Sequence, residues 1–284
     1  MANAIAKRPT TKTGITTYLS NEAVKKNIAS VIGEKGTQKF ISSVVSAVQT
    51  NPALAECSNS SILSAALLGQ SLNLTPSPQM GQFYMVPYQD KERGSQAQFQ
   101  LGYKGYIQLA VRSGQYRKIV ASEVRQGEIA SYNPITEEFV MKPVLDMEKR
   151  DNLPIIGYYA MFELTNGFRK ELYWPKEQME AHAKRYSKGY ARDLQKHTAY
   201  TFWSKDFDSM AKKTLLRQLI SKWGIMSIEM EKGYAGDMGI INEDGSVDYI
   251  DNTMTAADVV EAHQEEIAEN ANTVDIEVEE GEFT

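Results

Sequence analysis

The sequence predicts an α+β fold, with helices at both ends of the folded region and hairpin-forming strands between them. Three observations support this prediction. Apolar residues recur at helical spacing from Gln38 to Leu72, two-residue alternation dominates the segment from Gln82 to Tyr173, and a long helical period returns over Thr201–Lys222. This order of elements is typical of domains in which strands and helices are segregated along the chain.

The N-terminal part divides into a polar segment and two helical segments. Residues 1–35 are rich in Thr, Lys, Ala and Asn, so we expect a flexible N-terminal arm with a short helix around Tyr18–Ile32. Helices are expected over Gln38–Thr50, which Pro52 ends, and over Asn59–Leu72, whose first residue can cap it.

The middle of the chain has the composition and alternation of β-strands. Aromatic and β-branched residues alternate with polar ones, and the turn pair Asn166-Gly167 predicts a tight hairpin. A first hairpin with a charged tip is expected from Gln82–Tyr88 and Ala97–Tyr103, followed by a helix over Gly105–Ser113. Further strands are expected at Lys118–Val124, Glu138–Lys142, Ile155–Leu164 and Arg169–Tyr173, before a helix over Lys176–Tyr186.

The segment Thr201–Lys222 has the clearest helical period. At about 100° per residue, its apolar positions fall within one arc of roughly 140°. The basic residues of this segment fall on the opposite side, and they are Lys205, Lys212, Lys213 and Arg217.

The charge of the chain is divided unevenly. The total of 31 basic and 36 acidic residues gives a net charge of −5, but residues 235–284 contain 15 acidic residues and no basic ones. Residues 1–234 therefore carry 31 basic and 36 − 15 = 21 acidic residues, a net charge of +10. We expect a flexible arm over 1–35, a nucleic-acid-binding core over 36–234 and an acidic, mostly disordered tail over 235–284.

The sequence offers little support for an enzyme. The three His residues and Cys57 show no metal-ligand spacing, and no phosphate-binding loop of the GxxxxGK[ST] type occurs. A two-metal nuclease would require strand-end carboxylates, for which the candidates are Asp146, Glu148, Glu163 and Glu171. We therefore expect no catalytic site, no cofactor and no metal. The single Cys and the lack of a long apolar run predict a cytoplasmic protein without a membrane partner.

Basic and aromatic residues are interleaved from Tyr103 to the end of the long helix. Between Arg169 and Lys222 there are 13 basic and 6 acidic residues, a net charge of +7. Cations can pair with phosphates and aromatic faces can stack on unpaired bases, which suits single strands. Alternatives remain at this stage. Tyr103 can be a core residue, the segment 187–196 can be a polar loop, and Gly102 and Gly105 can serve either a tight turn or close approach of DNA.

Several ordered motifs resemble one known family. They are Leu72-Asn-Leu-Thr-Pro76, Gly81-Gln-Phe-Tyr-Met-Val-Pro87-Tyr88, Gln100-Leu-Gly-Tyr-Lys-Gly105, Arg112-Ser-Gly114, and Met210-Ala-Lys-Lys-Thr214 with Arg217. From about Phe40 to Tyr234 the chain resembles the RecT family of phage and prophage single-strand annealing proteins. Trp223-Gly224 departs from the Pro-containing helix end of some members, which affects only that boundary.

This resemblance implies both a fold and an activity. The family is thought to share a Rad52-like core, in which a small antiparallel sheet packs on a long helix. Its members coat single-stranded DNA as rings or helical filaments and anneal complementary strands without ATP, in a bacterial cytoplasm. The resemblance further implies an annealed duplex intermediate, a homo-oligomer, and a phage exonuclease and a host single-strand binding protein as partners.

Candidate DNA-binding residues come from two sources. The family motifs carry over to Tyr103, Lys104, Arg112, Lys212, Lys213 and Arg217. Basic character and position add Arg117, Lys118, Arg125, Lys184, Arg185, Arg192 and Lys205. Oligomerisation is expected to use the helices Gln38–Thr50 and Asn59–Leu72 or the hairpin tip around Asp90–Gln96, although these helices can equally complete the core. The alternative functions are a single-strand coat protein without annealing activity and a metal-dependent nuclease.

Overall fold

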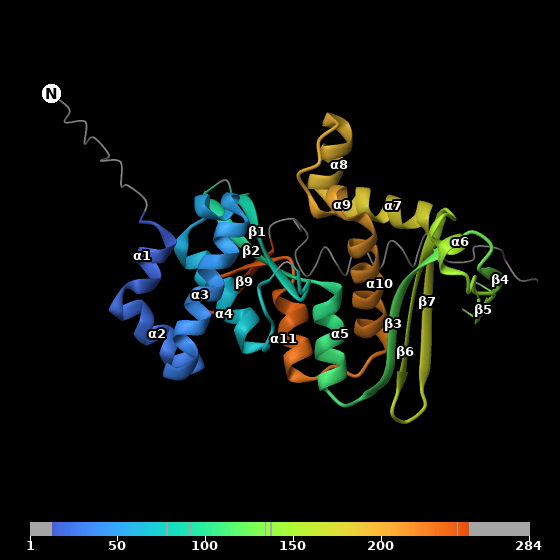
Figure 1. Ribbon diagram of the computed structural model, residues 1–284, viewed down its shortest axis with the longest axis horizontal. Helices are drawn as coiled ribbons and strands as arrows, with labels where there is room; N and C mark the ends of the chain where they lie inside the picture. Colours follow the sequence, from blue (N-terminus) through green and yellow to red (C-terminus); the bar gives the residue numbers. More distant parts are fainter. Residues whose placement is uncertain are drawn as a thin grey trace, which may run out of the picture. The chain divides into compact units, whose positions relative to one another are not determined.

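The computed structural model describes residues 13–249, apart from Pro78, Lys91, Pro134, Glu137 and Glu243. Helices and antiparallel strands alternate along this region (Figure 1), which confirms the predicted α+β fold. Residues 250–284 of the segment expected to be a disordered tail lie outside the described residues. Within residues 13–249, no helix combines the length and apolar character that a bilayer span requires.

The described chain begins with a group of helices. Leu19 and Ile28 are fully buried against this group, so the helix expected around Tyr18–Ile32 is confirmed and it packs on the core rather than standing in a flexible arm. Val24, Ile28 and Ile32 stand four residues apart, and this spacing gives a polar segment one apolar face. The elements are α1 (Ile15–Ser20), α2 (Glu22–Ile32), α3 (Glu34–Thr50), the short 3₁₀ helix η1 (Pro52–Glu56) and α4 (Asn59–Ser71).

A four-stranded antiparallel sheet packs against α4. Its order is β1 (Phe83–Asp90), β2 (Gly94–Leu101), β8 (Gly239–Ile241) and β9 (Val247–Tyr249). The predicted first hairpin is confirmed as β1–β2, in which Phe83 stacks on Phe99 at 5.2 Å. The pair β8–β9 comes from the segment expected to be acidic tail, so the core continues past residue 234.

A second sheet packs against the long helix α10 (Phe207–Trp223). Its antiparallel order is β3 (Tyr116–Arg125), β6 (Ile155–Leu164) and β7 (Arg169–Pro175). Gly167 in the β6–β7 turn has φ +87°, which confirms the tight hairpin predicted from Asn166-Gly167. The other face of this sheet is partly covered by the hairpin of β4 (Ile129–Asn133) and β5 (Glu138–Met141), which precedes α6 (Met147–Asp151).

The predicted helix over Thr201–Lys222 is two helices. It divides at Asp206, where φ is −150°, into α9 (Phe202–Lys205) and α10. The Asp206 carboxylate accepts a hydrogen bond from the Ser209 amide and so caps α10. The remaining helices are α5 (Tyr103–Arg112), α7 (Lys176–Tyr186), α8 (Lys188–Lys196) and α11 (Ile228–Gly236). The polar loop considered for residues 187–196 is therefore a helix.

Candidate nucleic-acid interface

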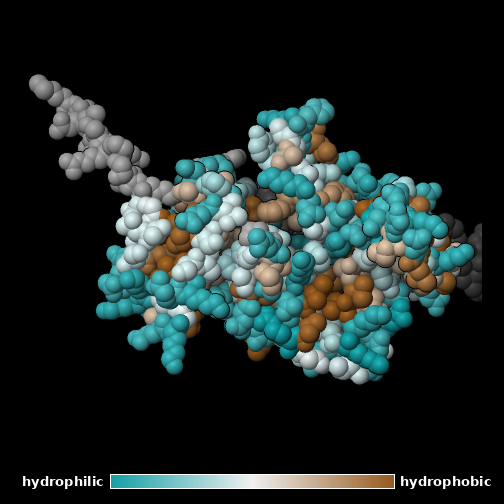
Figure 2. Space-filling model, in the orientation of Figure 1, coloured by the Kyte–Doolittle hydropathy of each residue, from teal (hydrophilic) through white to brown (hydrophobic). Residues whose placement is uncertain are grey.

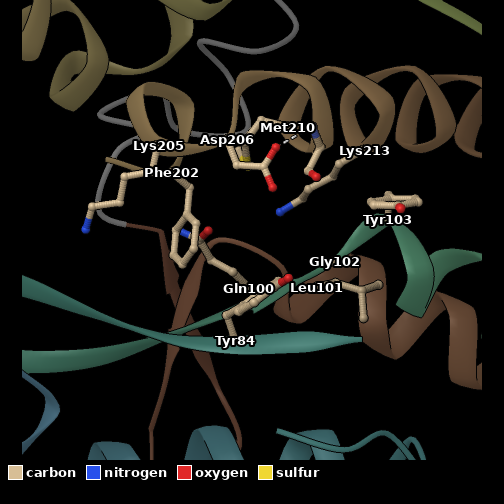
Figure 3. Close-up of a pocket in the computed structure, with 11 residues that line it drawn as sticks. Tyr84, Gln100, Leu101, Gly102, Tyr103, Phe202, Lys205, Asp206, Met210 and Lys213 are labelled. Carbon is tan, nitrogen blue, oxygen red and sulfur yellow. Dashed lines mark hydrogen bonds between the residues drawn. The ribbon is translucent and has the colours of Figure 1, made fainter. Parts of the chain in front are cut away.

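A cleft of about 110 Å³ lies between the β1–β2 hairpin and the helices α9 and α10. Figure 3 shows Phe202, Lys205 and Lys213 extending from the helices toward the strands that carry Tyr84 and Gln100. The N-terminal end of α5 closes one end of the cleft with Tyr103. Residues far apart in the sequence thus form one cavity wall.

Aromatic rings face each other across this cleft. Tyr84 pairs with Gln100 in the β1–β2 register, so both side chains lie on the sheet face that α4 does not cover. The Tyr84 ring lies 5.1 Å from the Phe202 ring, at an interplanar angle of 45°. Burial, assisted by the charge of Asp206, raises the pKa of Tyr84, so this side chain is a neutral, half-buried ring at pH 7.

Two exposed lysines stand at this cleft. Lys205 ends α9 and lines the cavity. Lys104 is not a lining residue, but it lies next to Tyr103 in the first turn of α5, with its aliphatic stem beside Gly81. Neither ammonium group forms an ion pair with any residue that the structure describes. Lys104 also adds charge to a helix N-terminus that is already electropositive. This end of the cleft therefore attracts anions.

The floor of the cleft contains a buried ionic network. The Asp237 carboxylate is fully buried and accepts hydrogen bonds from Lys213 Nζ at 2.8 Å and from an Arg217 guanidinium nitrogen at 2.7 Å. It also accepts hydrogen bonds from the Leu101 amide at 2.8 Å and the Tyr106 hydroxyl at 3.0 Å. One carboxylate thus joins β2, α5, α10 and the end of α11.

This network changes the role expected for Lys213 and Arg217. The sequence places both on a basic, solvent-facing arc, whereas the structure directs both to Asp237 and stacks Arg217 on the Tyr234 ring at 3.9 Å. Burial lowers the pKa of Lys213, and the neighbouring Asp237 opposes that effect. Two cations and one carboxylate leave the floor with a formal charge of +1, so these residues contribute a positive field rather than an exposed contact.

Lys212 and Tyr103 form a neighbouring unit. Lys212 Nζ lies 5.0 Å from the centre of the Tyr103 ring and 2.6 Å from a Glu123 carboxylate oxygen. Tyr103 is half-buried at the cleft, so the structure brings these two predicted residues together there. The Glu123 carboxylate already neutralises much of the Lys212 charge.

Gly102 and Gly105 serve the strand-to-helix turn. A Cβ atom on Gly102 would collide with the carbonyl oxygen of Gly81, and one on Gly105 would collide with that of Gln82. Both glycines therefore let β2 turn into α5 against the neighbouring backbone. Of the two alternatives left open by the sequence, the geometry supports the tight turn.

Four other predicted residues lie away from the cleft lining. Arg112 donates hydrogen bonds to the Leu72 and Asn73 carbonyl groups and so covers the end of α4. Arg125 donates to the Leu153 carbonyl group at 2.8 Å. Arg117 is 72% exposed on β3 and pairs with Glu163 at 3.1 Å, and Lys118 is exposed beside it. Arg112 and Arg125 thus have clear structural roles.

The remaining predicted residues belong to α7 and α8. Lys184, Arg185 and Arg192 are exposed there and do not line the cleft. Arg185 lies over the Tyr186 ring at 5.5 Å. The basic residues of the chain therefore form at least two surfaces.

Sequence reasoning missed Tyr84, Phe202 and Asp237. Strand alternation could have identified Tyr84, because Phe83 and Met85 are buried and the tyrosine between them must face the other side. Phe202 was not predicted to face the cleft, because Thr201–Lys222 was expected to be one continuous helix. Nothing local marks Asp237, whose partners lie up to 136 residues away.

Comparison with known proteins gives one family and two curated relatives. A model of the RecT family matches residues 38–265. The chain is 41% identical to the "Uncharacterized protein YqaK" of Bacillus subtilis (strain 168) over 238 residues, which cover 84% of this chain and 75% of the relative. It is 26% identical to "Protein RecT" of Escherichia coli (strain K12) over 228 residues, which cover 78% and 80%.

Proposed function

The chain belongs to the RecT family of DNA-annealing recombination proteins, and from this premise we propose that it binds single-stranded DNA and anneals complementary strands without ATP. The proposed setting is phage-type homologous recombination in the cytoplasm of a bacterial host cell. The observation that carries the proposal is the cleft in which aromatic rings stand beside lysines without ion pairs to any described residue.

The cleft suits the chemistry of an unpaired strand. Lys104 and Lys205 can neutralise successive phosphates and release their counterions. Tyr84, Tyr103 and Phe202 offer ring faces on which bases stack without regard to sequence. The net positive floor under Lys213 attracts the phosphate backbone without touching it. We assign the first strand to this cleft.

Annealing by such a site requires no chemical step by the protein. The protein lowers the repulsion between two phosphate backbones, and base pairing with the incoming strand supplies the free energy. No nucleotide hydrolysis enters this mechanism. The duplex intermediate is released when the paired bases leave the stacking surfaces.

The arrangement of β3, β6 and β7 on α10 supports the finer proposal of a Rad52-like core. We propose a homo-oligomer, as a ring or helical filament. Among the helices expected at its interface, α4 is largely enclosed by the core, which leaves α3 and the hairpin tip. The acidic segment 250–284, outside the described residues, is proposed to dock the exonuclease and the host single-strand binding protein.

The direct test mixes two complementary oligonucleotides, one with a donor and one with an acceptor fluorophore, with the full chain and no ATP. The proposal predicts faster duplex formation than in buffer alone. Binding of single strands without faster annealing would select the coat-protein alternative. Magnesium-dependent shortening of the labelled strands would select the nuclease.

A further inference from the structure

We propose that the exposed face of α8, with Tyr186 and Tyr200 beside it, is a second binding surface for single-stranded DNA that holds the incoming strand during annealing. This inference rests on the proposed annealing function and assigns one of its two strands. The surface is distinct from the cleft, whose lining includes no residue of α7 or α8.

A stripe of cations runs along α8. Lys188, Arg192 and Lys196 stand four residues apart, which places them within about 80° of one another around the helix. The buried residue Tyr190 lies on the opposite side of the helix, and the buried Asp193 lies about 100° from the middle of the stripe. Figure 1 shows α8 standing above α9, and Figure 2 shows mostly hydrophilic surface over it. The stripe therefore faces solvent.

The segment Lys184–Lys205 is almost entirely positive, and Glu180 of the adjacent helix α7 is an acidic group that lies near Tyr190 of α8. From Lys184 to Lys205 the sequence contains six basic residues and one acidic residue, Asp193. Asp193 is 3% exposed and faces the protein. The only acidic residue of this segment is therefore withdrawn from solvent, while Arg192 and Lys196 are exposed cations on the outer surface of the helix.

Asp193 fixes α8 to the wall of the cleft. Its carboxylate accepts hydrogen bonds from the amides of Tyr200 and Thr201 and from the hydroxyls of Thr198, Thr201 and Ser204, at 2.7–3.0 Å. Burial opposes ionisation of this carboxylate, but these hydrogen bonds outweigh that effect and lower the pKa of Asp193. Because Ser204 adjoins Lys205, the stripe has a fixed position relative to the cleft.

The two surfaces lie on different sides of the α9–α10 rod. Tyr190 of α8 packs against Trp203 and Phe207, with ring centres 6.1 Å apart in each pair. The cleft uses Phe202 and Met210 of the same two helices. Adjacent positions such as Phe202 and Trp203 differ by about 100° around a helix. A strand on the stripe thus runs beside the first strand and does not compete for the cleft.

Two exposed rings complete the surface. Tyr186 is 45% exposed and is supported from below by the His182 ring at 4.5 Å, while Tyr200 is 79% exposed. Fixed, exposed rings among cations are suited to stack on unpaired bases. Cations can pair with phosphates while the rings stack on bases, so this combination matches the chemistry of an unpaired nucleic-acid strand.

The test separates binding of one strand from annealing of two. In the full chain, Lys188→Gln, Arg192→Gln and Lys196→Gln are combined, and the affinity for one labelled oligonucleotide and the ATP-independent annealing rate are both measured. We expect the affinity to change less than about twofold and the annealing rate to fall about tenfold. For binding of a second strand to the chain already loaded with the first, the slope of log K against log salt should become shallower by roughly 2, because three phosphate contacts at about 0.7 each are lost.

Matched variants keep the result interpretable. Lys26→Gln, Lys142→Gln and Lys149→Gln remove the same charge from exposed positions outside α7–α9 and the cleft, and should leave both quantities unchanged. Tyr200→Ala, which alters an exposed side chain, should slow annealing without weakening binding of one strand. Equal losses of affinity and rate, or no loss of either, would overturn the proposal. A wild-type chain that binds a strand without annealing would instead refute the proposed function, and the α8 inference with it.

Discussion

Lys213 Nζ lies 2.8 Å from the Asp237 carboxylate, and neither side chain reaches solvent to a significant extent. This pair joins the middle of the long helix to the point where β2 becomes α5. A residue that charge composition assigns to an acidic tail is therefore a core residue. The DNA cleft proposed here depends on it for the position of its floor.

Asp237→Asn is expected to destabilise the fold. The substitution leaves the buried charge of Lys213 and the partly exposed charge of Arg217 without a counterion, which costs about 3–5 kcal/mol of unfolding free energy. Urea denaturation of the full chain measures the change. Asp151→Asn, at an exposed position, is the control and should alter the free energy by less than about 0.5 kcal/mol. Equal stability of the two variants would contradict the network's role.

The cleft rings are expected to contribute to affinity without regard to base sequence. Tyr84→Ala or Phe202→Ala should each cost about 1–3 kcal/mol of binding free energy, or roughly 5- to 150-fold in Kd for a single strand. Fluorescence anisotropy with several oligonucleotides checks this. Tyr84→Phe should retain most of the affinity. Tyr132→Ala, on the β4–β5 hairpin, is the matched control, and a loss there as large as in the cleft would refute the assignment.

Gly102→Ala separates a structural glycine from a DNA-contacting one. Its methyl group would collide with the Gly81 carbonyl oxygen, so we expect a loss of about 1–3 kcal/mol in unfolding free energy without any DNA present. Gly14→Ala adds a methyl group in open space and should not destabilise the chain. If Gly102→Ala had the unfolding free energy of the wild type but bound DNA more weakly, Gly102 would instead serve close approach of DNA.

His182 is expected to make stability depend on pH. Burial, together with the charge of Arg185, lowers the pKa of His182 to about 4, compared with about 6.5 in an unfolded chain. Between these values the unfolded chain binds more protons, so the free energy of unfolding rises with pH and the full contribution is present above about pH 6.5. His182→Phe retains a ring beside Trp174 and Tyr186 and should flatten the urea midpoints between pH 4.5 and 7. If the pH dependence of the unfolding free energy were the same in His182→Phe as in the wild type, it would not arise from His182.

Local sequence patterns were sufficient to predict a helix or strand where one face of the element is apolar. The helix α4 and the β6–β7 hairpin agree with the sequence because burial imposes a period of about four or two residues. The break at Asp206 could not be seen, because the apolar arc continues on both sides of it. The three-residue strands β8 and β9 are too short to show a period.

The sequence predicts which basic residues are candidates for the site, but not which way their side chains point. Lys212 and Lys213 are neighbours, yet a helix directs them about 100° apart, so one meets Glu123 and Tyr103 and the other meets Asp237. Composition treats both as surface cations. The sequence names Lys104 from the family motif and Lys205 from its basic character, and both are exposed, but their proximity depends on the path of β1, β2 and α9 in space.

Annealing by this chain is proposed to depend most on Lys104 and Lys205. The decisive measurement compares ATP-independent annealing by the wild-type chain and by the Lys104→Gln/Lys205→Gln variant, with Lys26→Gln/Lys149→Gln as the charge-matched control. We predict that the cleft variant anneals at least about tenfold more slowly, while the control anneals like the wild type. For single-strand binding, the slope of log K against log salt should be shallower by roughly 1.4 in the cleft variant, because two phosphate contacts are lost. Annealing by the cleft variant at the wild-type rate would contradict the account.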